Sequence, residues 1–185
     1  MFLSLDTETG GIGLDKSLLT LGLVIADDDF NVVDTYHWGL IPNDGVYRVD
    51  PNGLAVNKID LVELAKEAFT YREASQLLYA VISEHSNNGK EKIVPVGKNV
   101  GGDISQICDK LMKRGTWENF VSYRFLDVSS IYQLYRLKGL IPDTGGSLES
   151  ICEHYGYPTD GLHGALKDAE LTLKCLQRMA SEIGE

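Results

Sequence analysis

Two carboxylates stand near the start of the chain, where Asp6 and Glu8 flank a single threonine. They close a short apolar run, and side chains two positions apart on a strand point to the same face. Neighbouring carboxylates repel one another unless a cation lies between them, and Mg²⁺ or Mn²⁺ favours oxygen ligands. The pair is a candidate metal site, although a solvated strand end before a turn at Thr9-Gly10-Gly11 explains these residues more simply when they are taken alone.

A third carboxylate, Asp103, follows the apolar run Ile93 to Gly97 and stands where a helix is expected to begin. Asp is a favoured helix N-cap, which accounts for this residue without any ligand. The preceding Gly101 and Gly102 indicate a turn with unusual dihedral angles or a close approach of the backbone.

His163 and Asp168 form the third element, just before and within the last helical segment. Five positions apart on one helix, they would not share a face. If the helix starts near Ala165, His163 can lie over its first turn beside Asp168. Alone, this pair also has an ordinary explanation, because an Asp in a first turn complements the helix dipole.

Taken in order, these three elements resemble the motifs of the DnaQ-like (DEDDh) 3′→5′ exonucleases. The matching segments are Asp6-Thr7-Glu8-Thr9-Gly10, Asn99-Val100-Gly101-Gly102-Asp103 and His163-Gly164-Ala165-Leu166-Lys167-Asp168-Ala169. The segments Leu54 to Asp60 and Phe125 to Val128 resemble connecting parts of that family. Lys98 is a departure, since the family often has His before the Asn, and it affects only the expected contacts to the substrate strand.

The resemblance implies a 3′→5′ exonuclease that releases nucleoside 5′-monophosphates by a two-metal-ion mechanism with Mg²⁺ or Mn²⁺. It implies that Asp6 bridges both ions, that Glu8 and Asp168 complete the ion holding the attacking water, and that Asp103 serves the second ion. His163 is then the general base. Residues expected near the terminal nucleotide are Thr7, Thr9, Gly10 and Asn99. The expected partners are 3′ ends of single-stranded DNA or RNA, and a polymerase or another replication or repair protein.

Other functions fit parts of the pattern. Asp6-Thr7-Glu8-Thr9 loosely resembles the nucleophile strand of haloacid-dehalogenase-like phosphatases, which expect a second Asp where Glu8 stands. A catalytically silent module of the same fold, binding a nucleic acid or a polymerase, is the other alternative, although such modules normally lose acidic ligands first. Tyr123 and Tyr155 are candidates for stacking on bases, with core packing the commoner role.

Composition places the chain among ordinary globular proteins and limits its partners. With 185 residues, 43% hydrophobic, it predicts one domain, residues 1–185, that needs no disulfide. A net charge of −10 disfavours extensive wrapping by long duplex DNA and favours single-stranded or frayed ends. Three separated cysteines, and no segment typical of a signal peptide or membrane span, favour a cytoplasmic protein without a membrane partner.

The elements that must position these residues alternate after an initial run of strands. Hydrophobic patterning predicts strands at Phe2 to Asp6, Ser17 to Ala26, Phe30 to Ile41, Ile93 to Gly97 and Val121 to Leu126. Helical spacing is found around Leu61 to Ala68, Ala74 to Ile82, Ile104 to Met112, Val128 to Leu137, Ser147 to Gly156 and Ala165 to Ile183. The pattern predicts an α/β domain in which a mixed five-stranded sheet (three antiparallel strands, then parallel strands) is flanked by helices. The resemblance to the DnaQ-like family implies that this is a ribonuclease H-like fold.

Overall fold

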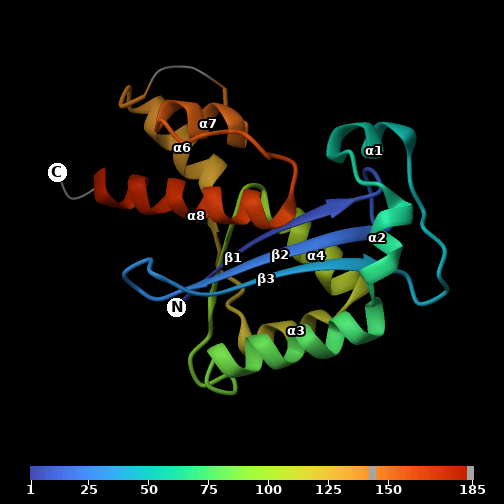
Figure 1. Ribbon diagram of the computed structural model, residues 1–185. Helices are drawn as coiled ribbons and strands as arrows, with labels where there is room; N and C mark the ends of the chain where they lie inside the picture. The colour runs from blue at the N-terminus through green and yellow to red at the C-terminus, as the bar shows by residue number, and fades with distance from the viewer. Residues whose placement is uncertain (142–144, 183–185) are drawn as a thin grey trace.

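The computed structural model describes residues 1–141 and 145–182, and it begins with an antiparallel meander (Figure 1). The strands are β1 (Phe2–Thr9), β2 (Leu18–Ala26) and β3 (Val32–Ile41). β2 pairs with both neighbours in antiparallel register. The turn between β2 and β3 is closed by the carboxylate of Asp27, which accepts hydrogen bonds from backbone N–H groups farther along the turn. The predicted meander is therefore confirmed.

Three shorter strands complete a mixed sheet, in the order β4-β3-β2-β1-β5-β6 among the described residues. β5 (Val94–Gly97) runs parallel to β1, and β6 (Leu126–Asp127) runs parallel to β5. The additional strand is β4 (Phe69–Thr70), whose two residues are too few to give a periodic signal. The mixed α/β sheet is as predicted, with six strands where five were expected.

The expected strand Val121 to Leu126 is largely a loop. Only Leu126 belongs to β6, and Val121 makes a single bridge to Ile93. Between them the chain turns, because the hydroxyl of Ser122 accepts a hydrogen bond from the backbone N–H of Arg124. The apolar and aromatic side chains of this segment suggested a strand, but Tyr123 and Phe125 are exposed to solvent.

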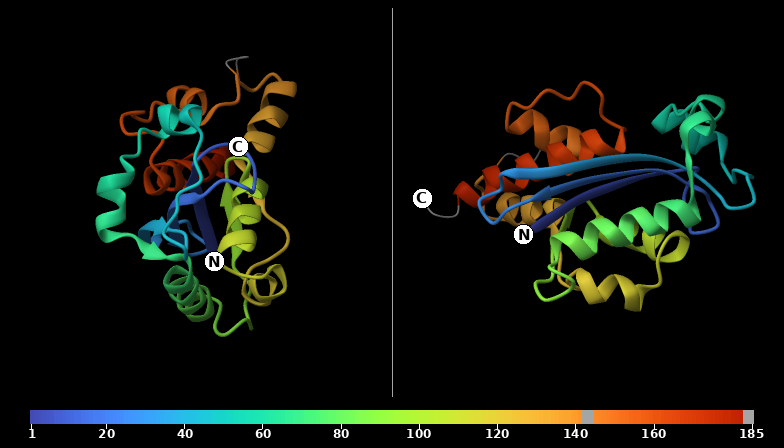
Figure 2. Two further views of the ribbon diagram at one scale, coloured as in Figure 1. Left: turned by 90° about the vertical axis from the view of Figure 1, so that its right-hand side faces the viewer. Right: turned by 60° about the horizontal axis from the view of Figure 1, so that its bottom comes forward.

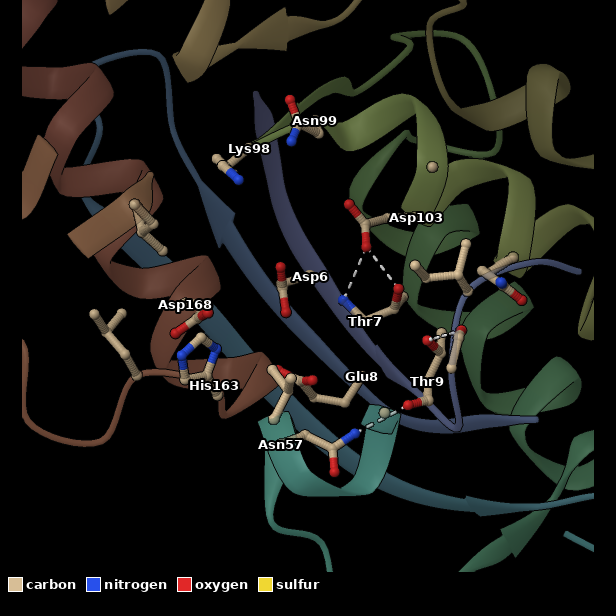
Figure 3. A pocket seen from close by; sticks show the side chains of 18 of the residues that line it. Asp6, Thr7, Glu8, Thr9, Asn57, Lys98, Asn99, Asp103, His163 and Asp168 are labelled. Carbon is tan, nitrogen blue, oxygen red and sulfur yellow. Dashed lines mark hydrogen bonds between the residues drawn. The ribbon is translucent and has the colours of Figure 1, made fainter. Parts of the chain in front are cut away.

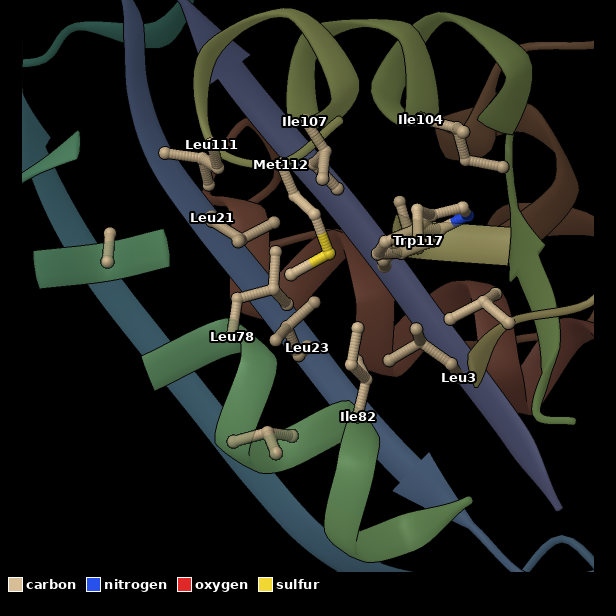
Figure 4. Close-up of a cluster of buried hydrophobic side chains, with 14 of the residues drawn as sticks. Leu3, Leu21, Leu23, Leu78, Ile82, Ile104, Ile107, Leu111, Met112 and Trp117 are labelled. Carbon is tan, nitrogen blue, oxygen red and sulfur yellow. The ribbon is translucent and has the colours of Figure 1, made fainter. Parts of the chain in front are cut away.

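One face of the sheet is covered by α3 (Tyr71–His85), α4 (Val100–Lys110) and α5 (Arg114–Phe120), as Figures 1 and 2 show. α3 opens with a capping box between Thr70 and Glu73. Figure 4 shows the core on this side, where Leu3, Leu21 and Leu23 meet side chains from these helices. The short α5 was not predicted, since its seven residues span barely two turns.

The opposite face carries α8 (Ala165–Glu182), which packs on β1 and β2, with α6 (Val128–Leu137) and α7 (Leu148–His154) beyond it. α8 buries a wider surface than the single predicted stripe, because it lies between the sheet and those two helices. Ala180, expected on the stripe, is exposed, and Ile183 lies outside the described residues. In this core the thiols of Cys152 and Cys175 are reduced, with their sulfur atoms 3.8 Å apart.

Two further helices, α1 (Pro51–Asn57) and α2 (Leu61–Glu67), lie at the end of the sheet where β1 finishes (Figure 1). α1 was not predicted as a helix; it starts with a proline at its first position, which suits a helix start. α2 buries no residue fully, and most of its predicted apolar face is half-buried, with only Ala65 exposed. Leu64 of this face covers Gly39 of β3. Across the described residues, the helices are too short or too polar to cross a bilayer.

Candidate active site

Three carboxylates from the two ends of the chain meet at one point beside β1. Asp6 and Glu8 project from the same face of β1, and Asp168 projects from the first turn of α8 (Figure 3). Oxygen atoms of the three groups lie within 4.8 Å of one another. That spacing allows one cation to contact all three carboxylates.

Gly22 of β2 makes this meeting possible. It is the register partner of Asp6, and it lies under the start of α8. A Cβ atom at Gly22 would stand only 2.3 Å from the backbone of Ala165 and Leu166. The helix therefore rests directly on the sheet, which brings its first turn next to Asp6. The sequence signal for this contact was a lone glycine inside an apolar strand, and it was overlooked.

Asp103 approaches the same cluster from the other side of β1. Its carboxylate accepts two hydrogen bonds from Thr7, one from the backbone N–H at 3.1 Å and one from the hydroxyl at 2.6 Å. Asp103 is not the N-cap of α4, because Asn99 occupies that place in a left-handed conformation with φ of 58°. The simple capping explanation of Asp103 is thus wrong, and the carboxylate is directed to the end of β1 instead (Figure 3).

Burial raises the pKa values of all four acids, and the charges of neighbouring carboxylates raise those of Asp6 and Glu8 further. Desolvation, followed by the charges of Asp103, Asp168 and Glu8, raises the pKa of Asp6 well above its usual range. Desolvation and then Asp168 and Asp103 raise the pKa of Glu8 to about 8. Burial also raises the pKa of Asp103, to about 6, against the lowering effect of its bonds from Thr7. The cluster therefore stores unfavourable negative charge that a cation would neutralise.

A second, independent observation supports a divalent cation at this cluster. One carboxylate oxygen of Asp168 is buried and lacks a hydrogen-bond partner among the described residues. Such an atom is unfavourable unless something else bonds to it. An all-oxygen donor set of carboxylates suits Mg²⁺ or Mn²⁺.

His163 lies in the loop that leads into α8, as expected from the predicted helix start at Ala165. Its φ of 69° is left-handed, and its side chain is exposed beside Asp168 (Figure 3). Burial raises the pKa of Asp168, while the backbone and charge of His163 oppose that shift. The imidazole is thus close to the cluster and open to solvent.

Lys98 is also part of the site, although from the sequence it was only a departure from the family pattern that affected the expected contacts to the substrate strand. It lines the same cavity from the end of β5, and its positive charge lowers the pKa values of Asp6, Asp103 and Asp168. Part of the charge of the carboxylates is therefore balanced within the protein.

These groups line a cavity of about 540 Å³. Of the residues expected near the substrate, Thr7, Thr9 and Asn99 line it, whereas Gly10 is buried below it, close to the backbone of Arg48. The hydroxyl of Thr7 bonds to Asp103, and the hydroxyl of Thr9 donates to the carbonyl of Gly11 at 2.8 Å.

Two amide side chains that sequence reasoning missed hold the rim of this cavity. Asn57, buried at the end of α1, donates from Nδ2 to the carbonyl of Thr9 at 2.9 Å. Gln106 of α4 donates from Nε2 to the carbonyl of Gly13 at 3.1 Å. No local pattern marks either residue, since both partners are distant in the sequence.

The fold is shared with nuclease structures. E. coli exonuclease I in complex with a dT13 oligonucleotide superposes with a TM-score of 0.78 at 17% identity, over 97% of this chain and 41% of that chain. The zinc-bound form of the E. coli exonuclease I complex with single-stranded DNA gives a TM-score of 0.78 at 16% identity, over 97% of this chain and 40% of that one. The chain therefore spans about two-fifths of the length of these proteins. No curated protein sequence matches it.

The sheet order, the flanking helices and these likenesses define the class, a ribonuclease H-like domain. Residues 56–179 match the DEDDh_C family, described as DNA polymerase III subunit epsilon-like, C-terminal domain. The chain belongs to this family, and the predicted DnaQ-like (DEDDh) membership and fold are confirmed.

Proposed function

We propose that this chain is a 3′→5′ exonuclease, a single domain over residues 1–185, that hydrolyses terminal phosphodiester bonds of single-stranded or frayed nucleic-acid ends. The products are nucleoside 5′-monophosphates. One observation carries the proposal: Asp6, Glu8 and Asp168 bring their oxygens within 4.8 Å of one another in a chain of the DEDDh family.

The carboxylates are the proposed holders of two divalent cations, Mg²⁺ or Mn²⁺. Asp6 would contribute to both ions, Glu8 and Asp168 would hold one of them with Asp6, and Asp103 would hold the other. When bound, such ions activate a water molecule and stabilise negative charge on the attacking and leaving oxygens. Thr7 holds Asp103 in place through its two hydrogen bonds.

His163 is the proposed general base. It is exposed at the edge of the cavity beside Asp168, where a ring nitrogen can accept the proton of an attacking water. Histidine is suited to this step because it exchanges protons near neutral pH. The left-handed backbone before α8 turns the imidazole over the first helical turn.

The cavity accommodates the terminal nucleotide next to Thr7, Thr9 and Asn99, which line it, with Gly10 buried behind them. The backbone of Gly10 and Gly11 is closely packed against α1, since a Cβ on Gly53 would stand 2.6 Å from the carbonyl oxygen of Gly10. The backbone at Gly10 and Gly11 is therefore held rigidly where the sugar of the terminal nucleotide would lie. The net charge of −10 favours contact with a few terminal nucleotides, and oligonucleotides bound to the related exonuclease I folds agree with a single-stranded substrate.

The test is to incubate the protein with end-labelled single-stranded DNA and RNA, with Mg²⁺, Mn²⁺ or EDTA. We expect the protein to shorten DNA, RNA or both from the 3′ end in a metal-dependent way, with release of mononucleotides. Asp6→Asn should abolish it, and Asp29→Asn, which removes an exposed charge in the β2–β3 turn, should not. Intact 3′ ends in both metals would favour the catalytically silent module, and release of inorganic phosphate alone would favour a phosphatase.

A further inference from the structure

A loop with one arginine between two aromatic residues, Tyr123-Arg124-Phe125, stands next to the first turn of α4. Tyr123 is 64% exposed and Phe125 is 45% exposed, which is unusual for two rings so close in sequence. Between them, Arg124 places its guanidinium carbon 4.7 Å from the ring centroid of Tyr123. Neither ring belongs to the buried hydrophobic core on this side of the sheet.

This loop is adjacent to the candidate active site but separate from it. It borders a cavity of about 110 Å³, together with Gly101 and Ile104 of α4 and Arg114 of α5. The neighbouring residues on the same turn of α4, Asn99, Gly102 and Asp103, line the larger cavity that holds the carboxylates. The two cavities are thus separated by the width of one helix, about 10 Å. A few nucleotides of an extended strand can span that distance.

Charge distinguishes this region from the rest of the chain. Residues 98–126 carry five Lys or Arg and three Asp or Glu, a net charge of +2. Residues 1–97 carry a net charge of −8, and residues 127–185 a net charge of −4. Arg114 has a carboxylate neighbour, Glu118, at 3.8 Å, and Arg124 lies exposed over Tyr123. A phosphate backbone is therefore drawn to this region more than to other parts of the chain.

We propose that Tyr123 and Phe125 form a stacking platform for the bases that lie upstream of the cleaved nucleotide, with Arg124 near the backbone phosphates. The inference rests on the proposed exonuclease function, since it names how the rest of the single strand is held. Bases of any kind stack on exposed aromatic rings, and nearby arginines add attraction for the strand. The occupant is a single-stranded nucleic acid; a protein partner on the same loop is an outcome of the test below.

The experiment compares an oligothymidylate of about 12 nucleotides, a length in the range that such binding sites cover, with a thymidine dinucleotide. Binding of the long strand and the KM and kcat for both substrates are measured for the wild type, Tyr123→Ala, Phe125→Ala and Tyr123→Phe. Tyr79→Ala is the matched control, because Tyr79 is also exposed, at 48%, but lies on α3. Thermal melting of each variant checks that it folds.

We expect Tyr123→Ala and Phe125→Ala to weaken binding of the long strand and to raise its KM by about five- to a hundredfold. The dinucleotide is too short to reach the loop, so its kinetics should remain those of the wild type. Tyr123→Phe keeps the ring and should restore binding, and Tyr79→Ala should change nothing. Arg124→Gln should remove about one phosphate contact. The slope of log binding constant against log salt concentration should then become less steep by about 0.7.

Unchanged binding of the long strand in both alanine variants overturns the platform and leaves the loop as a surface for a protein. Equal losses on both substrates also overturn it, because they indicate damage to the site. If the wild type cleaves neither substrate, the exonuclease proposal fails by itself. The binding measurements on the long strand still decide the platform in that case.

Discussion

Thr7 donates two hydrogen bonds to one carboxylate oxygen of Asp103, from its backbone N–H and from its hydroxyl. The bonds connect the end of β1 to the first turn of α4, so that residues 96 positions apart act as one unit. Successive side chains of β1 point to opposite faces, so that Asp6 and Glu8 face α8 and Thr7 faces α4. A single strand thereby positions acids contributed by two helices on its opposite faces.

Replacing Thr7 by Val should shift the acid limb of the pH–activity profile to higher pH. The bonds from Thr7 lower the pKa of Asp103, which burial has raised to about 6, so losing the hydroxyl raises that pKa further. More acid is then protonated at a given pH below neutrality, and kcat/KM falls there most. The profile is measured from about pH 5 to 9 beside Thr35→Val, an exposed threonine of β3. Coinciding profiles for Thr7→Val and wild type would contradict this role.

Gly22→Ala should lower the free energy of unfolding by about 1–3 kcal/mol, since the added methyl group overlaps the backbone at the start of α8. It should also weaken metal binding, because Asp168 moves with that helix. Urea unfolding and titration with Mn²⁺ measure the two effects. Gly115→Ala is the control, because nothing lies within 4 Å of its Cβ position in α5, and it should be neutral or slightly stabilising. Equal stability of the two variants would rule out the close contact.

The metal-free protein should lose stability as pH rises from about 4.5 to 8. The pKa of Glu8 is raised from 4.5 to about 8, so the folded state keeps a proton that the unfolded state releases over this range. The free energy of unfolding is therefore highest at low pH, where Glu8 is protonated in both states, and it falls as pH rises from 4.5 to about 8. Mg²⁺ replaces the proton, and the increase in Tm that it causes should grow with pH. Scanning calorimetry with Mg²⁺ and with EDTA checks this, and a pH-independent Mg²⁺ effect would be the contrary result.

His163→Ala should lower kcat by about 10²- to 10⁴-fold, the usual contribution of a general base, with little change in stability or metal binding. The exposure of the side chain explains the small structural cost. Asp6→Asn should differ from it: metal binding is weakened, and the metal-free protein becomes more stable near pH 8, because a neutral amide replaces an acid whose ionised form this buried cluster disfavours. Activity assays are read beside Mn²⁺ titrations and melting curves. Comparable metal affinities in the two variants would contradict the assigned roles.

The amino-acid sequence by itself determined the long periodic elements and the identity of the acids. The meander, α3, α6 and α8 follow from runs whose spacing is local, and Asp6, Glu8, Asp103, His163 and Asp168 were named from their motifs. The elements that were not predicted are α1, β4 and α5. β4 has only two residues, and α1 and α5 show a weaker apolar pattern than the equally short α2 and α7, which were predicted. The segment Val121 to Leu126 was predicted as a strand because aromatic residues are common in strands, although in the structure Tyr123 and Phe125 are exposed.

Only the tertiary structure decided which groups meet. The contact of Gly22 with α8, the bonds from Thr7 to Asp103 and from Asn57 to Thr9, and the position of Lys98 among the acids all join segments far apart in the chain. The physical reason is that periodicity reports which face of an element is apolar, whereas a site depends on how two such faces are set against each other. The position of one element on another is fixed by single contacts, such as that of Gly22 with the start of α8, and a single contact leaves no periodic pattern in the sequence.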